Sequence, residues 1–318
     1  MPRILVVAPN WIGDALMAQP LLARLREKVP GAELDVIAPA WVAAVARRMP
    51  EVHEVISAPL RHGALQLRER WTLGRVLRQR RYDRAIVLPN SWKSALVPFF
   101  AGIPVRSGYV GESRYGLLNL LYKSEAAPMR LHYARLAEPP GTDPAQPLPQ
   151  PRLRADPAAV AAAARRYGMR GPYAVLCPGA EYGPAKRWPY FGELAQGLDI
   201  EVVLLGSAKD AEAAHGIPGK NLIGKTTLDE AIDLVAGAAF VVSNDSGLMH
   251  VAAALERPQV ALFGSSSPRH TPPQSQAARV LWLGIECSPC FQRECPLGHF
   301  RCMRDIPVQR VLSELHSL

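Results

Sequence analysis

Residues 240–255, FVVSNDSGLMHVAAAL, decide the fold class, because an apolar run passes through a short polar turn into a helical pattern. Residues 240–243 predict a buried strand and residues 248–255 predict a helix. An earlier predicted strand, residues 84–88, leads into a helix through the turn at 89–91 in the same way. Short apolar strands that alternate with helices are typical of parallel sheets with crossover helices. The chain is therefore predicted to be an α/β protein.

The pattern occurs twice along the chain. Each half begins with a strand, a loop rich in proline and glycine, a helix and a second strand. The strand, helix and second strand are predicted at 3–8, 15–28 and 33–37 in the first half, and at 173–177, 189–197 and 201–205 in the second half. Residues 138–157 contain seven prolines and predict a stiff, extended linker. We therefore expect two doubly wound, Rossmann-like domains, residues 1–150 and 151–318, facing each other across a cleft that holds the ligand.

Length and composition limit the class of protein. The chain has 318 residues, about the length of two domains, and 48% of them are hydrophobic, which indicates a globular protein. No apolar run approaches the roughly 18 residues that a membrane-spanning helix needs. The first residues, MPRILVVAPNWIGD, have five apolar residues before Pro9 and no small-residue cleavage site. A cytoplasmic location is expected.

The positive charge is concentrated in the first half. Residues 1–150 contain 20 Lys and Arg against 12 Asp and Glu, and eight arginines lie between Arg61 and Arg84. A solvated helix face accounts for such a run; an anionic partner, such as a phospholipid surface, a phosphorylated glycolipid or a nucleic acid, is the alternative. Aromatic residues make up 7% of the chain and do not alternate with the arginines, so stacking on single-stranded nucleic acid is not expected.

Four of the five cysteines lie close together, at Cys287, Cys290, Cys295 and Cys302, with His299 among them. In a cytoplasmic protein such a cluster suggests metal ligands or reduced thiols rather than disulfides. The Cys-x2-Cys pair suits a structural zinc site, but the following gaps of four and six residues do not match paired zinc knuckles. Both interpretations, a zinc site and free thiols under a long loop, remain open.

The match to a phosphate-binding loop at Gly219-x4-Gly224-Lys225-Thr226 is interpreted as accidental. Such a loop follows a buried strand. Here residues 213–218 do not form a strand pattern, and Leu222-Ile223 inside the motif resembles a short strand itself. Thr227-x2-Glu230 predicts a capping box that opens the next helix.

The turn at Asp245, Ser246 and Gly247, together with His250, is a candidate anion site. Backbone N–H groups at a helix N-terminus favour a phosphate, and Gly247 allows a ligand close to the backbone. His250 lies one helical turn after Ser246, on the same face, and can help to hold a polar ligand. The alternative is an ordinary capped helix with Asp245 or Ser246 as the cap.

Two charged residues in other strand-to-helix loops are candidates for catalysis. Lys186 precedes a helix in the loop 178–189 and could neutralise a departing diphosphate; an exposed loop lysine is the alternative. Asp14 follows the first strand and could act as a general base or as a helix cap. No Asp-x-Asp pair occurs, so a divalent-metal diphosphate clamp of that type is not expected.

With these residues the chain resembles the ADP-heptose:lipopolysaccharide heptosyltransferases of glycosyltransferase family 9. The matching stretches are spread over almost the whole chain: PNWIGDALMAQ at 9–19, YDRAIVLPNSWKSALVPFFAGIP at 82–104, PGAEYGPAKRWP at 178–189, NDSGLMHVAAAL at 244–255 and VALFGSSSPRHTPP at 260–273. The linker and the cysteine segment do not share this resemblance.

The resemblance implies a GT-B fold and inverting transfer of L-glycero-D-manno-heptose from ADP-heptose to the first heptose of the inner core. It implies that Asp14 is the general base that deprotonates the acceptor hydroxyl and that Lys186 stabilises the departing ADP. Residues 1–150 become the acceptor domain and residues 151–318 the donor domain. The donor-site residues that it implies are Asp245, Ser246, Gly247 and His250, with Gly224, Lys225 and Thr226 near the nucleotide.

Transfer would need no cofactor. The implied acceptor is heptosyl-Kdo-lipid A at the inner face of the cytoplasmic membrane, so the enzyme would be peripheral to that membrane, with no nucleic acid as partner. The first alternative is heptosyltransferase I or another family member with a different core acceptor. A nucleic-acid-binding protein with a zinc-bearing tail is the remote alternative, and it would leave the motifs of the second half unexplained.

Overall fold

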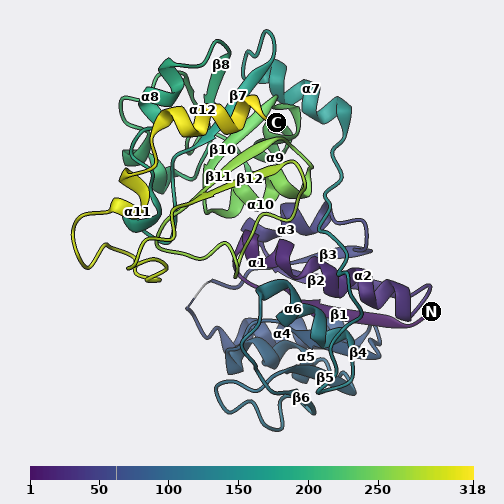
Figure 1. Ribbon diagram of the computed structural model, residues 1–318. Helices are drawn as coiled ribbons and strands as arrows, with labels where there is room; N and C mark the ends of the chain where they lie inside the picture. The colour runs from purple at the N-terminus through teal and green to yellow at the C-terminus, as the bar shows by residue number, and fades with distance from the viewer. Residues whose placement is uncertain (62) are drawn as a thin grey trace. The chain divides into compact units, whose positions relative to one another are not determined.

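The structure, a computed structural model, describes residues 1–61 and 63–318 (Figure 1). The chain divides into two compact units, Met1–Pro151 and Arg152–Leu318, here called unit 1 and unit 2. Each unit contains one parallel six-stranded sheet with helices between the strands, which confirms the predicted α/β class and the duplication. Within the described residues, no helix is long and apolar enough to cross a membrane.

The sheet of unit 1 has the order β3-β2-β1-β4-β5-β6. Its strands are β1 (Arg3–Val7), β2 (Glu33–Pro39), β3 (Glu54–Ala58), β4 (Arg84–Val87), β5 (Val105–Tyr109) and β6 (Leu120–Tyr122). Its helices are α1 (Ile12–Met17), α2 (Gln19–Lys28), α3 (Ala40–Arg47), α4 (Leu67–Arg78), α5 (Leu96–Phe100) and α6 (Met129–Ala134), with short 3-10 turns at Trp92–Ala95 and Arg135–Ala137.

The sheet of unit 2 has the order β12-β11-β10-β7-β8-β9. Its strands are β7 (Tyr173–Cys177), β8 (Glu201–Leu204), β9 (Lys220–Asn221), β10 (Phe240–Asn244), β11 (Gln259–Phe263) and β12 (Ala278–Trp282). Its helices are α7 (Pro157–Arg166), α8 (Phe191–Gln196), α9 (Leu228–Gly237), α10 (Gly247–Ala254), α11 (Arg301–Arg304) and α12 (Val308–His316), with 3-10 turns at Pro184–Lys186, Ala208–Asp210 and Glu212–Ala214.

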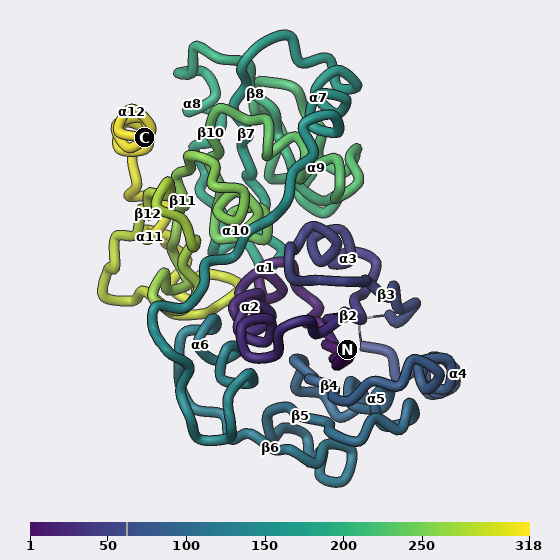
Figure 2. Tube along the Cα trace, turned by 90° about the vertical axis from the view of Figure 1, so that its right-hand side faces the viewer, coloured from purple at the N-terminus to yellow at the C-terminus, as the bar shows by residue number. Residues whose placement is uncertain are grey.

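The two sheets have the same topology. When the strands of each unit are numbered from its own first strand, both sheets run 3-2-1-4-5-6, so β1 corresponds to β7 and β4 to β10. The central strand β7 is buried along its whole length, as expected for a parallel strand covered on both faces. In Figure 2, α12 and the packed pair α7 and α9 lie on opposite sides of the strands of unit 2.

Two sequence-based boundaries differ from the structure. The predicted helix 15–28 is two helices, α1 and α2, because Pro20 lacks the N–H group that would continue the helix from α1. The predicted strand at Leu222-Ile223 lies two residues earlier, in β9. There the Asn221 Oδ1 atom accepts a hydrogen bond from the Ile223 N–H group at 3.1 Å, and the chain turns.

The proline-rich linker contains neither helix nor strand between residues 139 and 156. Its first part is held on unit 1 by arginine side chains. The Arg24 guanidinium donates to the carbonyl oxygens of Ala145 and Pro147 at 2.7 and 2.9 Å, and Arg130 donates to the carbonyl oxygen of Leu148 at 2.9 Å. The linker therefore has no regular secondary structure, and its middle part is fastened to unit 1.

Candidate active site

Asn244, at the carboxyl end of β10, fixes the loop that follows β7. Its side chain is fully buried. The Asn244 Nδ2 atom donates to the Pro178 carbonyl oxygen at 2.8 Å, and the Asn244 Oδ1 atom accepts from the Trp188 N–H group at 3.0 Å. One side chain thus holds both ends of the loop 178–188. Because β7 and β10 are neighbours in the sheet, this loop and the turn after β10 lie at the same edge.

Lys186 in that loop forms an ion pair with Asp245. The Lys186 Nζ and Asp245 Oδ2 atoms are 2.5 Å apart, and their side chains are 15% and 5% exposed. The Ser266 hydroxyl donates to the same carboxylate oxygen at 2.5 Å. Lys186 is therefore not the exposed loop lysine of the alternative interpretation. It is a mostly buried cation whose position is set by an anion and by the loop on which it lies.

Ser246, Gly247 and His250 belong to the start of α10. Ser246 is the N-cap residue, but its hydroxyl pairs with the Ser243 hydroxyl at 3.0 Å and makes no side-chain cap bond. Burial lowers the pKa of His250 to about 4; the Asp245 carboxylate opposes this decrease and the Lys186 ammonium adds to it. His250 is consequently a neutral imidazole at physiological pH, next to a charged pair.

Gly224, Lys225 and Thr226 form a turn between β9 and α9. The Gly224 N–H group donates to the Gly206 carbonyl oxygen at 3.0 Å, which places this turn beside the loop that follows β8. Lys225 is exposed and donates to the Asn221 carbonyl oxygen at 2.9 Å. Thr227 is the N-cap of α9 and forms the predicted capping box with Glu230. The preceding strand has two residues and lies at the edge of the sheet, unlike the buried strand before a phosphate-binding loop.

Asp14 of unit 1 lies in the first turn of α1, directly after β1. The N-cap of this helix is Trp11, so Asp14 is not the capping residue. Its side chain is half-buried. Burial raises the pKa of Tyr133 above its usual range, and the negative charge of Asp14 raises it further. A carboxylate is thus present at the carboxyl edge of the sheet of unit 1.

The cysteine segment follows β12 in unit 2, and its last cysteine, Cys302, lies in α11. Its four cysteines are free thiols. They line one small cavity of about 20 Å³ together with His299, Ala185 and Ser265. Burial raises the pKa of Cys302 to about 11, and the other three thiols contribute to the increase, so the four sulfur atoms lie near one another. Burial also raises the pKa of Cys295, but the N–H groups of residues 297–300 lower it more, and the net shift is downward.

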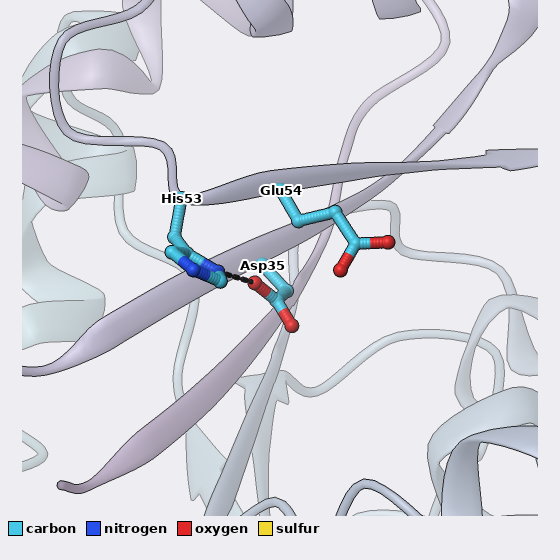
Figure 3. A group of neighbouring side chains, drawn as sticks. All are labelled: Asp35, His53 and Glu54. Atoms are coloured by element: carbon cyan, nitrogen blue, oxygen red, sulfur yellow. Dashed lines mark hydrogen bonds and ion pairs between the residues drawn. The ribbon is translucent and has the colours of Figure 1, made fainter.

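A second group of possible metal ligands lies in unit 1 and is best explained as an ion-pair network. Among the described residues, only Asp35, His53 and Glu54 bring three ligand atoms within 4.8 Å of one another (Figure 3). Arg80 donates to both Glu54 oxygens at 2.6 and 2.9 Å. The buried Asp35 accepts from the Tyr82 hydroxyl at 2.5 Å and from His53 at 2.9 Å. The carboxylates are already neutralised and hydrogen-bonded, so no metal is proposed here.

Sequence reasoning missed the side chains that hold the candidate residues in place. Asn244 lies inside the quoted motif at 244–255, yet its spacing gives no sign that it clamps a loop 60 residues earlier in the chain. Ser266 belongs to the stretch 260–273, where three serines are adjacent and nothing distinguishes them. An invariant asparagine in aligned relatives would have been the signal for Asn244.

Comparisons with known proteins agree over nearly the whole chain. The sequence model of glycosyltransferase family 9 (heptosyltransferase) matches residues 70–301. The chain is 47% identical to lipopolysaccharide heptosyltransferase 2 from Escherichia coli K12, over 99% of this chain and 98% of that protein. It is 27% identical to lipopolysaccharide heptosyltransferase 1 from Pseudomonas aeruginosa, over 92% and 87% respectively.

A solved structure gives the same result. The ADP-heptose lipopolysaccharide heptosyltransferase II of E. coli matches with a TM-score of 0.88 and 44% identity, covering 99% of this chain and 98% of that one. With the two doubly wound sheets, this match confirms the predicted GT-B fold.

Proposed function

Because the chain belongs to glycosyltransferase family 9, the heptosyltransferases, we propose that it transfers L-glycero-D-manno-heptose from ADP-heptose to the first heptose of the lipopolysaccharide inner core. The observation that carries the choice of acceptor is the identity of 47% to heptosyltransferase 2, against 27% to heptosyltransferase 1. The chain is a glycosyltransferase, and the alternative of a nucleic-acid-binding protein is not supported. Heptosyltransferase I, with a different core acceptor, is the less well supported alternative.

The acceptor assignment is tested by ADP release with purified inner-core acceptors that carry zero, one or two heptoses. We expect the highest kcat/KM with the acceptor that carries one heptose. A preference for the acceptor without heptose would instead assign the enzyme to the first transfer. ADP-heptose without any acceptor measures background hydrolysis.

The polar edge of unit 2 is the proposed donor site, which makes residues 151–318 the donor domain. Negative charge develops on the ADP oxygens as the sugar–phosphate bond breaks, and a mostly buried cation stabilises it more than an exposed one. Lys186 is such a cation and takes this role without metal assistance. Ser246 and Gly247 supply N–H groups at the start of α10 for a phosphate oxygen. Neutral His250 is a hydrogen-bonding group for the donor, and Asp245 holds Lys186 in place.

Gly224, Lys225 and Thr226 are proposed to lie near the nucleotide. The support is the hydrogen bond from Gly224 to Gly206, which brings this turn beside the loop after β8, next to β7 in the sheet. Lys225 is exposed, so its contribution to ADP affinity is expected to be smaller than that of Lys186.

Asp14 is the proposed general base, and residues 1–150 the acceptor domain. An inverting transfer needs one carboxylate to take the proton of the acceptor hydroxyl as the new glycosidic bond forms. Asp14 is half-buried at the carboxyl edge of its sheet, where ligands of doubly wound domains bind. Its negative charge raises the pKa of Tyr133, a residue of helix α6.

The acceptor is a lipid, and helix α4 offers a surface suited to an anionic membrane. Leu67, Arg68, Trp71, Arg75 and Arg78 are exposed and fall on one flank of the helix by their spacing of three, four and seven residues. The Arg75 guanidinium lies 5.0 Å from the centre of the Trp71 ring. Basic and aromatic residues of this kind bind at the headgroup level of anionic bilayers. We propose that the enzyme is cytoplasmic and peripheral to the inner membrane surface through this flank.

The cysteine cluster is proposed as a structural zinc site that takes no part in transfer. Its residues fit the group: Cys287, Cys290, Cys295 and Cys302 supply four sulfur ligands around one cavity, and the N–H groups near Cys295 favour the thiolate that zinc binds. His299 can replace one thiol. Elemental analysis of protein purified without an affinity metal column tests this, and less than about a tenth of an equivalent of zinc or iron, with four freely titrating thiols, contradicts it.

A further inference from the structure

The loop that carries Lys186 is attached to the cysteine segment. The Ala185 N–H group donates to the Arg293 carbonyl oxygen at 3.0 Å, and the Tyr182 hydroxyl donates to the Phe291 carbonyl oxygen at 2.6 Å. Gly183 between them has a φ of 147°, and a Cβ atom there would lie 2.5 Å from the Arg293 carbonyl oxygen. The two backbones therefore approach more closely than any other residue at position 183 would allow.

Tyr182 connects this attachment to the proposed catalytic cation. The centre of its ring lies 4.9 Å from the Lys186 Nζ atom and 5.3 Å from the Arg293 guanidinium carbon. The ring thus contacts Lys186 through its π-face, while its hydroxyl is fixed to the backbone of the cysteine segment. A displacement of Phe291 or Arg293 would move the ring and with it the position that Lys186 prefers.

The positions of Phe291 and Arg293 depend in turn on the cysteines. Both residues lie between Cys290 and Cys295 in a stretch without helix or strand. Phe291 has a left-handed backbone with a φ of 53°, which is unfavourable for a bulky residue and persists where the surroundings impose it. Ala185, the neighbour of Lys186, lines the same cavity as the four thiols. No three of the ligand atoms yet lie within 4.8 Å of one another, so they must draw together to bind one ion.

We infer that a divalent, thiolate-bound metal ion at the cysteine cluster sets the affinity of the enzyme for the ADP part of its donor, with Tyr182 as a positioning residue for Lys186. This inference rests on the proposed donor site. The ion restricts the segment to one conformation, so that Lys186 is ordered before the diphosphate arrives and less ordering accompanies binding. By linkage, ADP must then raise the affinity for the metal by the same factor.

The experiment compares three forms of the full-length enzyme: as purified, depleted of metal by a chelator under reducing, oxygen-free conditions, and reloaded with one equivalent of Zn²⁺ or Fe²⁺. Titration calorimetry measures the Kd for ADP, and elemental analysis measures the bound metal. We expect depletion to weaken ADP binding about tenfold. In free energy, this loss is about half or more of the loss expected when one charge-assisted hydrogen bond is removed. Reloading restores the original Kd.

The variant Tyr182→Phe separates the attachment from the metal. It removes the hydrogen bond to Phe291 and leaves the ring, so it retains about one equivalent of metal but binds ADP several-fold more weakly. Its ADP affinity also responds less to metal depletion than that of the wild type. Tyr190→Phe, the same chemical change eight residues later, is the matched control, and Cys177→Ala controls for loss of a thiol outside the cluster. Both controls keep the metal and the coupling.

Three results would overturn the inference. If the reloaded enzyme retains no metal, the site is wrong. If loaded and depleted enzyme bind ADP within twofold of each other, the coupling is absent, although the donor site stands. If metal binds stoichiometrically but no form binds ADP, the proposed donor site itself fails and the inference fails with it.

Discussion

The turns after the fourth strand of each unit occupy the same place in the same topology, yet they are held differently. In unit 1, the buried guanidinium of Arg114 donates to the carbonyl oxygens of Pro89 and Tyr109 beside the turn at 89–91. In unit 2, the neutral amide of Asn244 donates to the backbone instead, and the charged pair of Asp245 and Lys186 lies beside it. The guanidinium that supports the backbone in unit 1 is thus replaced by a neutral amide in unit 2, and the ion pair beside that amide lies at the proposed donor site.

Replacing Lys186 should have the largest effect on the turn of unit 2. Lys186→Ala should lower kcat/KM about 10³-fold, because both donor binding and stabilisation of the departing ADP depend on this cation. Lys186→Arg should recover only part of the loss, since a planar guanidinium does not reproduce the shape of an ammonium group. Steady-state kinetics with varied ADP-heptose measures both effects. An Ala variant with unchanged kcat/KM would leave Lys186 as a structural partner of Asp245.

Asp14→Asn tests the other unit and should have the next largest effect. The amide retains the shape of the carboxylate but is not a base, so kcat should fall about 10²-fold while the Kd for ADP stays unchanged. Single-turnover kinetics and calorimetry measure the two quantities. The exposed Asp199, changed in the same way, serves as the control. Near-normal turnover of the Asp14 variant would show that another group takes the proton.

Arg114→Met should lower the stability of the protein without changing its affinity for ADP, which would distinguish the turn of unit 1 from that of unit 2. Removing the guanidinium leaves buried carbonyl oxygens at the turn of unit 1 without donors, which should cost about 2–3 kcal/mol of unfolding free energy. ADP affinity should not change, because the proposed donor site lies in unit 2. Chemical denaturation and calorimetry provide the two readings, and the exposed Arg310, changed to Met, is the control. A large loss of ADP affinity in the Arg114 variant would contradict a purely structural role.

At neutral pH His250 should give the smallest effect, because its contribution appears only in the pH dependence of stability below pH 6.5. The native state keeps His250 neutral down to a pKa of about 4, while the unfolded chain takes up the proton near pH 6.5. Stability should therefore decrease as the pH falls from 6.5 towards 4, by up to about 1.4 kcal/mol per pH unit from this group, with no contribution above 6.5. His250→Gln should flatten this slope. An identical slope in the variant would mean that other groups cause it.

The sequence was sufficient for the fold because hydrophobic periodicity repeats in both halves. The strands at 84–87 and 240–244 end within one residue of their predicted positions, since an apolar run that stops at a polar turn has a definite end. The pair of Lys186 and Asp245 was not predicted, although each residue was singled out separately. They lie 59 residues apart in the chain, and only pairing of β7 with β10 brings their loops together.

Helix boundaries failed where a local effect competed with periodicity. The apolar pattern continues through residues 15–28, but Pro20 interrupts the hydrogen-bond ladder that the pattern predicts. The thiol cluster shows a different limit of sequence-based prediction, namely contacts between irregular loops. Its composition suggests ligands, yet no periodicity indicates that the backbone between the second and third cysteines supports Tyr182, because that contact joins two irregular loops.

The stretch that joins the two units has a consequence for proteolysis. A protease binds an extended substrate by hydrogen bonds to successive N–H and C=O groups, and proline offers no N–H group. Seven prolines lie between residues 138 and 157, and arginine side chains already occupy the carbonyl oxygens of Ala145, Pro147 and Leu148. A segment without helix or strand is usually the first to be cut in a chain of two units. This one should resist cleavage, and the two halves should stay covalently joined where an ordinary linker would be severed.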